Sequence, residues 1–155
     1  METTLSAREL LERGRRLIAE GRSADALEPL RRAHALAPDD ATCRSAYGLC
    51  LGRVEGPFDE ALALCSEAAK QEFFNPELYL NLARLHLEFG FKPEGVRYLR
   101  RGQMIDPGNE SIAAAIVELG LRRSPVLSFL PRRHLLNRWL GGARHLFARR
   151  QRAVA

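Results

Sequence analysis

The stretch from Pro76 to Asn109, PELYLNLARLHLEFGFKPEGVRYLRRGQMIDPGN, holds the pattern that decides the fold. Asn75 followed by Pro76 is typical of a helix start, because an asparagine cap precedes a proline at the first helical position. Gly90 is typical of a helix end, and Pro93 of the start of the next helix. The stretch therefore predicts two helices joined by a short turn.

Small and apolar residues of this stretch recur in the rest of the chain at steps of 34 or 35 residues. The five columns are Gly14, Gly48 and Ala83; Ala26, Ala61 and Gly95; Leu30, Cys65 and Leu99; Ala33, Ala68 and Gly102; and Pro38 with Pro107. Small residues must recur where two helices cross closely, and large apolar residues where neighbouring repeats meet. The period therefore predicts an all-α repeat protein.

The period and the order of residues resemble the tetratricopeptide repeat (TPR), a helix–turn–helix unit of 34 residues. The matching residues are Leu10, Gly14, Leu17, Ala26, Leu30, Ala33 and Pro38 in repeat 7–40; Tyr47, Gly48, Leu51, Ala61, Cys65 and Ala68 in repeat 41–75; and Tyr79, Leu82, Ala83, Gly95, Leu99, Gly102 and Pro107 in repeat 76–109. The second repeat departs from the pattern, with one extra residue in its turn at 54–57 and Phe73 in place of the closing proline. The resemblance implies a right-handed α-solenoid.

Capping signals extend the pattern to seven helices between Ser6 and Leu119. Ser6 with Glu9 matches a capping box, Ser23 is the expected cap of the second helix, and Asn109 that of the seventh. The seventh helix has an apolar stripe that would cover the last repeat. We expect a TPR domain over 1–120, with a capping helix at 109–120.

Composition divides the chain into two parts of opposite charge. The net charge is +5, but residues 1–118 hold 15 basic and 19 acidic residues, whereas residues 119–155 hold nine arginines and no acid. Residues 121–155 form a basic, amphipathic tail, in which apolar residues recur at helical spacing. The tail residues expected to make contacts are Arg133, Arg138, Trp139, Leu146, Phe147 and Arg149.

Three interpretations of the tail stay open. Its apolar stripe packs on the solenoid, or it lies on an anionic membrane surface, or it docks on a protein partner or a nucleic acid. Nucleic acid is the weakest of these, because few aromatic residues are present to stack on bases.

The sequence shows no constellation typical of catalysis. It lacks a glycine-rich phosphate loop, and its four histidines have no partner at metal-ligand spacing. The three cysteines, Cys43, Cys50 and Cys65, form no CxxC pair and are expected to be small buried side chains. We therefore expect no catalytic, cofactor or metal site, and no enzymatic activity.

The TPR resemblance implies a concave groove lined by the first helix of each repeat. Arginine and asparagine among apolar side chains suit an extended or helical segment with an acidic group. Some relatives hold a terminal carboxylate with a fixed polar set, which Leu11, Ala46 and Glu77 break, so heat-shock chaperone tails are not the expected ligand. The expected groove residues are Arg8, Leu11, Arg15, Ile18, Thr42, Ser45, Leu49, Leu80, Asn81 and Arg84.

We therefore expect a protein–protein interaction scaffold or adaptor with a protein or peptide partner. A peripheral membrane adaptor and a secretion-chaperone-like protein are the alternatives. The first residues lack the pattern of a signal peptide, and no apolar run approaches the roughly 20 residues of a membrane span. We expect a cytoplasmic protein, with the inner membrane face as the alternative, and the arginine-rich, lysine-poor composition favours a bacterial source. The oligomeric state stays open.

Overall fold

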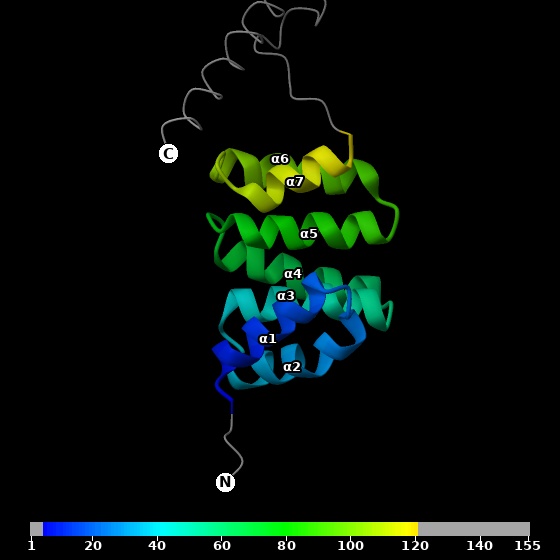
Figure 1. The fold of residues 1–155 in the computed structure, drawn as a ribbon. Coiled ribbons are helices and arrows are strands. Elements are labelled where there is room, and N and C mark those ends of the chain that lie inside the picture. Colours follow the sequence, from blue (N-terminus) through cyan, green and yellow to red (C-terminus); the bar gives the residue numbers. More distant parts are fainter. Residues whose placement is uncertain (1–4, 121–155) are drawn as a thin grey trace, which may run out of the picture. The chain divides into compact units, whose positions relative to one another are not determined.

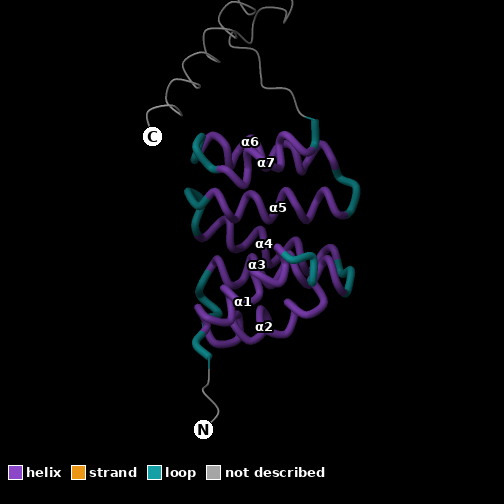
Figure 2. The backbone as a smooth tube through the Cα atoms, viewed as in Figure 1, coloured by secondary structure: helices purple, strands orange, loops and turns teal. Residues whose placement is uncertain are grey.

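The computed structural model describes residues 5–120, which form seven helices joined by short loops (Figures 1 and 2). No strand occurs within these residues. The all-α prediction and the number of helices are therefore confirmed. The helices are α1 (Ala7–Ala19), α2 (Ser23–Leu36), α3 (Ala41–Val54), α4 (Phe58–Gln71), α5 (Pro76–Glu88), α6 (Lys92–Ile105) and α7 (Glu110–Glu118).

The helices form hairpins that stack in chain order (Figure 1). Helix α1 packs on α2, α3 on α4 and α5 on α6, and α3 contacts both α1 and α5. This succession of helical hairpins is the predicted solenoid. The predicted residue limits of the individual repeats stay a prediction.

Local capping explains where most of the helices begin. The Ser6 hydroxyl accepts from the Glu9 backbone N–H at 3.3 Å, and the Glu9 carboxylate accepts from the Ser6 backbone N–H at 2.8 Å, which completes the predicted capping box. Asn75 and Asn109 cap α5 and α7 with their side-chain oxygens. These caps satisfy backbone donors that would otherwise have no partner.

The predicted cap of the second helix is wrong. Ser23 is the first residue inside α2, and Arg22 occupies the cap position without a capping side chain. Gly21, with a positive φ of 77°, follows the end of α1, and only Glu20, Gly21 and Arg22 separate the two helices. The Arg22 guanidinium instead donates to the Asp25 carboxylate at 2.8 Å.

The core lies where the repeating columns place small and apolar residues. The alanines of these columns, such as Ala61 and Ala68, are fully buried, as are Leu30, Cys65 and Leu99. Their burial between helices explains why the columns tolerate only compact or apolar side chains.

Helix α7 covers the last hairpin. Ile112 is 1% exposed and packs in one cluster with Leu80, Ala83 and Leu99. On the same side of α7, Ala115 and Ile116 are partly buried against this cluster. The apolar stripe predicted for this helix therefore closes the stack.

None of the helices within residues 5–120 has the length and apolar character needed to cross a membrane.

Candidate interaction groove

A groove of about 740 Å³ runs along α1, α3 and α5 and reaches α7. Six of the ten expected groove residues line it: Arg15, Ile18, Leu49, Leu80, Asn81 and Arg84. The other residues that line it are Ala19, Ala46, Arg53, Glu77, Asn109, Ser111 and Glu118.

The remaining four expected residues do not line the groove. Leu11 is 6% exposed and packs in the core between the first helices, and Ser45 is fully buried. Neither side chain presents a surface to a partner, because neighbouring helices cover both. Arg8 is exposed and Thr42 half-buried, but both lie outside the groove lining.

Ser45 has a packing role that its burial makes necessary. Its hydroxyl accepts a hydrogen bond from Asn81 Nδ2 at 3.1 Å, which joins α3 to α5 beneath the groove. A buried hydroxyl and a buried amide each cost free energy unless they find a partner. The pair therefore fixes the spacing of the two helices that form the groove floor.

Arg15 connects the outer helices of the groove. It donates to Glu12 on its own helix at 2.9 Å and to Glu77 on α5. Its positive charge is therefore balanced by two carboxylates. The ion pair with Glu77 joins α1 to α5 within the groove.

Arg53 and Arg84 form the basic part of the groove. Arg53, 20% exposed, meets Glu88 with 3.3 Å between Nε and Oε2, whereas Arg84 makes no ion pair with any residue of the described range. Burial, together with the positive charge of Arg53, lowers the pKa of Arg84. An anion at this point would relieve the cost of holding two guanidinium groups in a partly dry groove.

Arg53 is not among the expected groove residues, because it lies in the last turn of α3, beyond the groove positions implied by the repeat resemblance. The sequence contained one indication that Arg53 faces the groove. Arg53 follows Leu49 by four residues, and side chains four apart share a helix face.

The apolar anchors expected in the groove are largely covered. Leu49 is 2% and Leu80 4% exposed, so both belong to its floor. Ile18 is half-buried on the wall and offers more apolar surface. The accessible surface of the groove is therefore mainly polar and charged.

The described residues offer little to support catalysis or metal binding. Within 5–120 no group of His, Cys, Asp and Glu side chains is close enough to hold a metal ion. Burial raises the pKa of Cys65 to about 12 and that of Cys50 to about 11, so these thiols are weak nucleophiles near neutral pH. The expected tail contacts Arg133, Arg138, Trp139, Leu146, Phe147 and Arg149 lie outside the described residues.

No family model and no curated protein matches the sequence. Several solved structures match the fold. YrrB, "a TPR protein with an unusual peptide-binding site", is 22% identical, with a TM-score of 0.56. The match covers 73% of this chain, and this chain spans only 58% of the length of YrrB. The first TPR domain of human RPAP3 is 15% identical with a TM-score of 0.58, covering 74% of this chain and 89% of that domain.

The first TPR of Spaghetti (RPAP3), solved bound to the HSP90 peptide SRMEEVD, is likewise 15% identical, with a TM-score of 0.56. The match covers 74% of this chain and 90% of that one. These similarities confirm the TPR solenoid fold that the repeat pattern predicted.

Proposed function

Starting from the TPR fold of its seven helices, we propose that this chain is a non-catalytic interaction module that binds a segment of a protein partner in the groove. Two structural neighbours support a peptide-binding role for the fold, since YrrB is described by its peptide-binding site and RPAP3 was solved with a peptide. Because a fold alone does not define a function, the proposal also depends on the side chains of the groove.

The main evidence for this proposal is the environment of Arg84. Its guanidinium is half-buried, has no ion-pair partner among the described residues, and lies with Arg53 in one groove. A carboxylate of a partner segment would accept hydrogen bonds from the planar guanidinium, and such charge-assisted bonds are stronger than neutral ones. The partner segment therefore carries an acidic side chain that binds at Arg84.

Binding of the HSP90 peptide SRMEEVD is not part of the proposal. The carboxylate of Glu77 lies in the groove and interacts with Arg15, while Leu11 is covered by the core. Leu11, Ala46 and Glu77 stand where relatives that hold a terminal carboxylate have polar or basic groups, so the set that would hold such a carboxylate is incomplete here. We expect internal acidic segments, not heat-shock chaperone tails, as ligands.

The test compares full-length protein with Arg84→Glu and with a matched charge change outside the groove. Arg32→Glu is the control, since Arg32 is exposed on α2 and does not line the groove. In affinity capture from the source lysate, quantified by mass spectrometry, we expect a partner retained by wild type and control to fall about tenfold or more with Arg84→Glu.

Circular dichroism must show the same helicity for all three proteins. Equal capture by wild type and Arg84→Glu would contradict the role of the groove. Binding of the SRMEEVD peptide at micromolar concentration that is lost when its terminal carboxylate is amidated would contradict the proposed ligand class.

A second proposed role concerns the tail. Nine arginines without an acidic residue in 119–155 favour contact with an anionic membrane surface, and the measurement that tests it is co-sedimentation with anionic vesicles. This role would place a cytoplasmic interaction module at the inner membrane face.

A further inference from the structure

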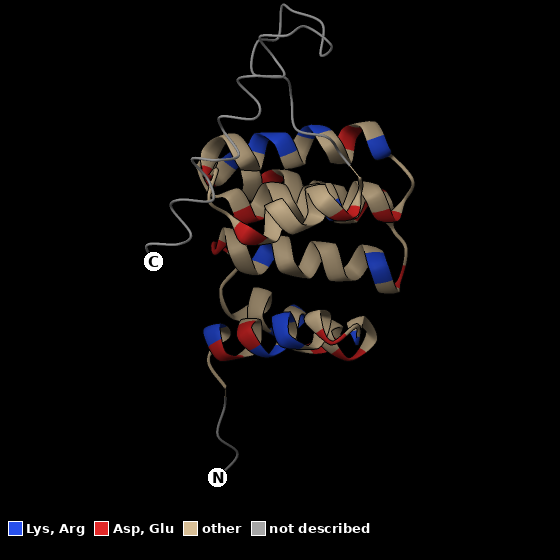
Figure 3. Ribbon diagram, turned by 45° about the horizontal axis from the view of Figure 1, so that its top comes forward, with Lys and Arg blue, Asp and Glu red and all other residues tan. Residues whose placement is uncertain are grey.

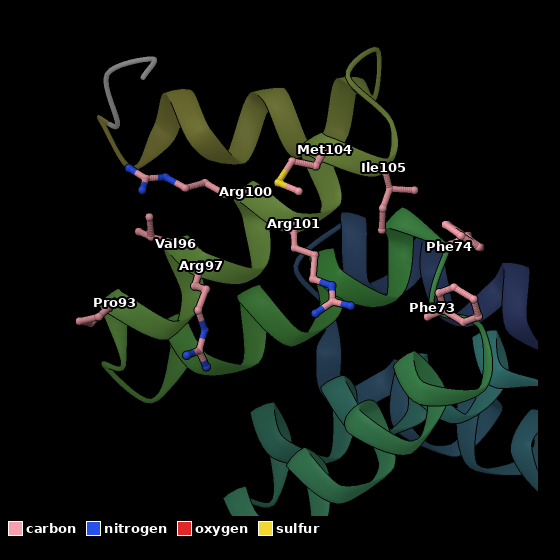
Figure 4. A pocket seen from close by; sticks show the side chains of 9 residues that line it. All are labelled: Phe73, Phe74, Pro93, Val96, Arg97, Arg100, Arg101, Met104 and Ile105. Carbon is pink, nitrogen blue, oxygen red and sulfur yellow. The ribbon is translucent and has the colours of Figure 1, made fainter. Parts of the chain in front are cut away.

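A second hollow, of about 740 Å³, lies between α6 and the turn that precedes α5 (Figure 4). It shares no lining residue with the groove. We call it the outer patch. Its lining residues are Phe73, Phe74, Pro93, Val96, Arg97, Arg100, Arg101, Met104 and Ile105.

The apolar side chains of the outer patch are unusually exposed. Phe74 is 73% and Met104 81% exposed, and Phe73, at 53%, occupies the position where the other repeats have proline. Grouped apolar exposure of this kind, bordered by charged residues, typically marks an interaction site.

The turn that carries the two phenylalanines is held in place. The rings of Phe73 and Phe74 pack with 4.2 Å between their centroids. The Tyr79 hydroxyl on α5 donates to the Phe73 carbonyl at 3.1 Å. The aromatic pair is therefore positioned before any partner binds, which reduces the entropy cost of binding.

The charge of the outer patch has one sign. Arg97, Arg100 and Arg101 lie on α6, and none of the nine lining residues is acidic. Arg101 lies over the Tyr79 ring at 5.0 Å and Arg97 over the Tyr98 ring at 5.6 Å. None of the three forms an ion pair within residues 5–120. Stacking on a ring occupies the face of a guanidinium and leaves its N–H edge free to donate.

We propose that the outer patch binds an acidic amphipathic helix of a partner protein. A large apolar side chain of that helix enters the hollow that Phe74, Met104 and Ile105 line. The arginines at 97, 100 and 101 cover one helical turn. They therefore match carboxylates three or four residues apart on a partner helix.

Charge distinguishes this occupant from the chain's own tail. The tail has nine arginines and no acidic residue, so the arginines of α6 would repel it. The hollow between the turn and α6 also fits a protruding side chain better than a flat lipid surface.

The experiment measures binding of designed, fluorescein-labelled peptides of about 18 residues, or five helical turns. One has leucine on one helix face and glutamate on the other, the second has lysine in place of glutamate, and the third is a scrambled version of the first. Full-length protein is compared with the Arg97→Glu/Arg100→Glu/Arg101→Glu variant and with Phe74→Ser. The control variant, Arg13→Glu/Arg16→Glu/Arg32→Glu, changes the charge equally at exposed residues outside both hollows.

We expect fluorescence anisotropy to show binding of the amphipathic glutamate peptide to wild type and control. The affinity should fall about tenfold or more in the α6 triple variant and clearly in Phe74→Ser, while the lysine and scrambled peptides bind far more weakly. Equal affinity of the α6 triple variant and the control would overturn the proposal, as would absence of binding to wild type.

Two further measurements identify the other occupants. If phosphatidylserine vesicles bind through the same arginines and the glutamate peptide does not, the patch is a lipid contact and the proposal is wrong. If the protein self-associates in sedimentation and Phe74→Ser abolishes this without lowering the affinity for the peptide, the occupant is a second copy of the chain and the proposal is wrong.

Discussion

At the scale of single residues, burial determines the chemistry of the three cysteines. Cys43, Cys50 and Cys65 are at most 1% exposed. Burial raises their pKa from 9.0 to about 11, about 11 and about 12, respectively. The folded protein therefore keeps these thiols protonated at a pH where the unfolded chain has lost its thiol protons.

This difference predicts a loss of stability in alkali. Above about pH 9 the folded state binds more protons than the unfolded state, so the free energy of unfolding falls as the pH rises. At about pH 10 the loss amounts to roughly 1 kcal/mol per thiol. Urea unfolding at neutral pH and about pH 10 measures it, and the Cys43→Ala/Cys50→Ala/Cys65→Ala variant should lose distinctly less stability over this interval. An equal loss in both proteins would contradict the prediction.

The sequence predicted some of the residues that line the groove, but not how deeply each expected side chain is buried. Arg15, Asn81 and Arg84 line it as expected, because they occupy groove positions that the TPR resemblance implies. The depth of Leu11 and Ser45 depends on how closely neighbouring helices approach. That approach depends on side chains far away in sequence, which a single repeat does not contain.

At the scale of helices, the closeness of α3 and α4 depends on Gly48. A Cβ atom at this position would lie 2.9 Å from Leu64 Cβ and 3.1 Å from the Ala61 carbonyl oxygen. Both atoms are on or next to the α4 backbone, so a change of rotamer cannot move them away. A side chain at position 48 would therefore force α3 and α4 apart.

We predict that Gly48→Ala destabilises the protein. Alanine favours the helix over glycine by about 1 kcal/mol, whereas overpacking at a fixed helix crossing costs about 1–3 kcal/mol. The packing term should prevail and lower the free energy of unfolding by up to about 2 kcal/mol. Urea unfolding followed by circular dichroism measures the change.

Gly108→Ala is the matched control. Gly108 lies in a turn, and a Cβ there would meet only Asp106 Oδ1, at 3.4 Å. Its stability should stay within about 0.5 kcal/mol of wild type. A Gly48→Ala variant as stable as this control would show that α3 and α4 can separate without cost.

The start of a helix could be predicted from the sequence where a capping side chain close to that start determines it. Ser6, Asn75 and Asn109 act within three residues of their own position, and the structure confirms all three. The expectation for Ser23 was wrong because the turn after α1 has only three residues, and Arg22, the last of them, takes the cap position. In this short turn the geometry of the backbone overrides the capping preference of serine.

At the scale of the whole molecule, charge separates the repeats from the tail. Acidic and basic residues both occur along the described helices (Figure 3). Residues 1–118 have a net charge of −4, whereas residues 119–155 have +9. The mixed charges of the repeats therefore favour a partner with charged groups at matching positions, whereas the arginines of the tail favour any surface with dense negative charge.

The tail sequence predicts binding to anionic membranes. Each arginine near such a surface contributes about 1 kcal/mol, and apolar residues such as Trp139 and Phe147 would add burial at the headgroup boundary. Full-length protein should co-sediment with phosphatidylserine vesicles at low salt and less at high salt, because salt screens the attraction. The Arg133→Glu/Arg138→Glu/Arg149→Glu variant should stay in solution.

The controls separate the tail from every other basic surface of the protein. The Arg13→Glu/Arg16→Glu/Arg32→Glu variant changes the net charge equally and should bind vesicles like wild type, as should the α6 triple variant. Trp139 is the only tryptophan, so its fluorescence reports on the tail and should shift to the blue on binding. If vesicles leave both sedimentation and fluorescence unchanged, the tail does not bind lipid. The apolar residues at helical spacing in the tail would then favour packing on the solenoid or docking on a protein partner, with a nucleic acid as the weakest alternative.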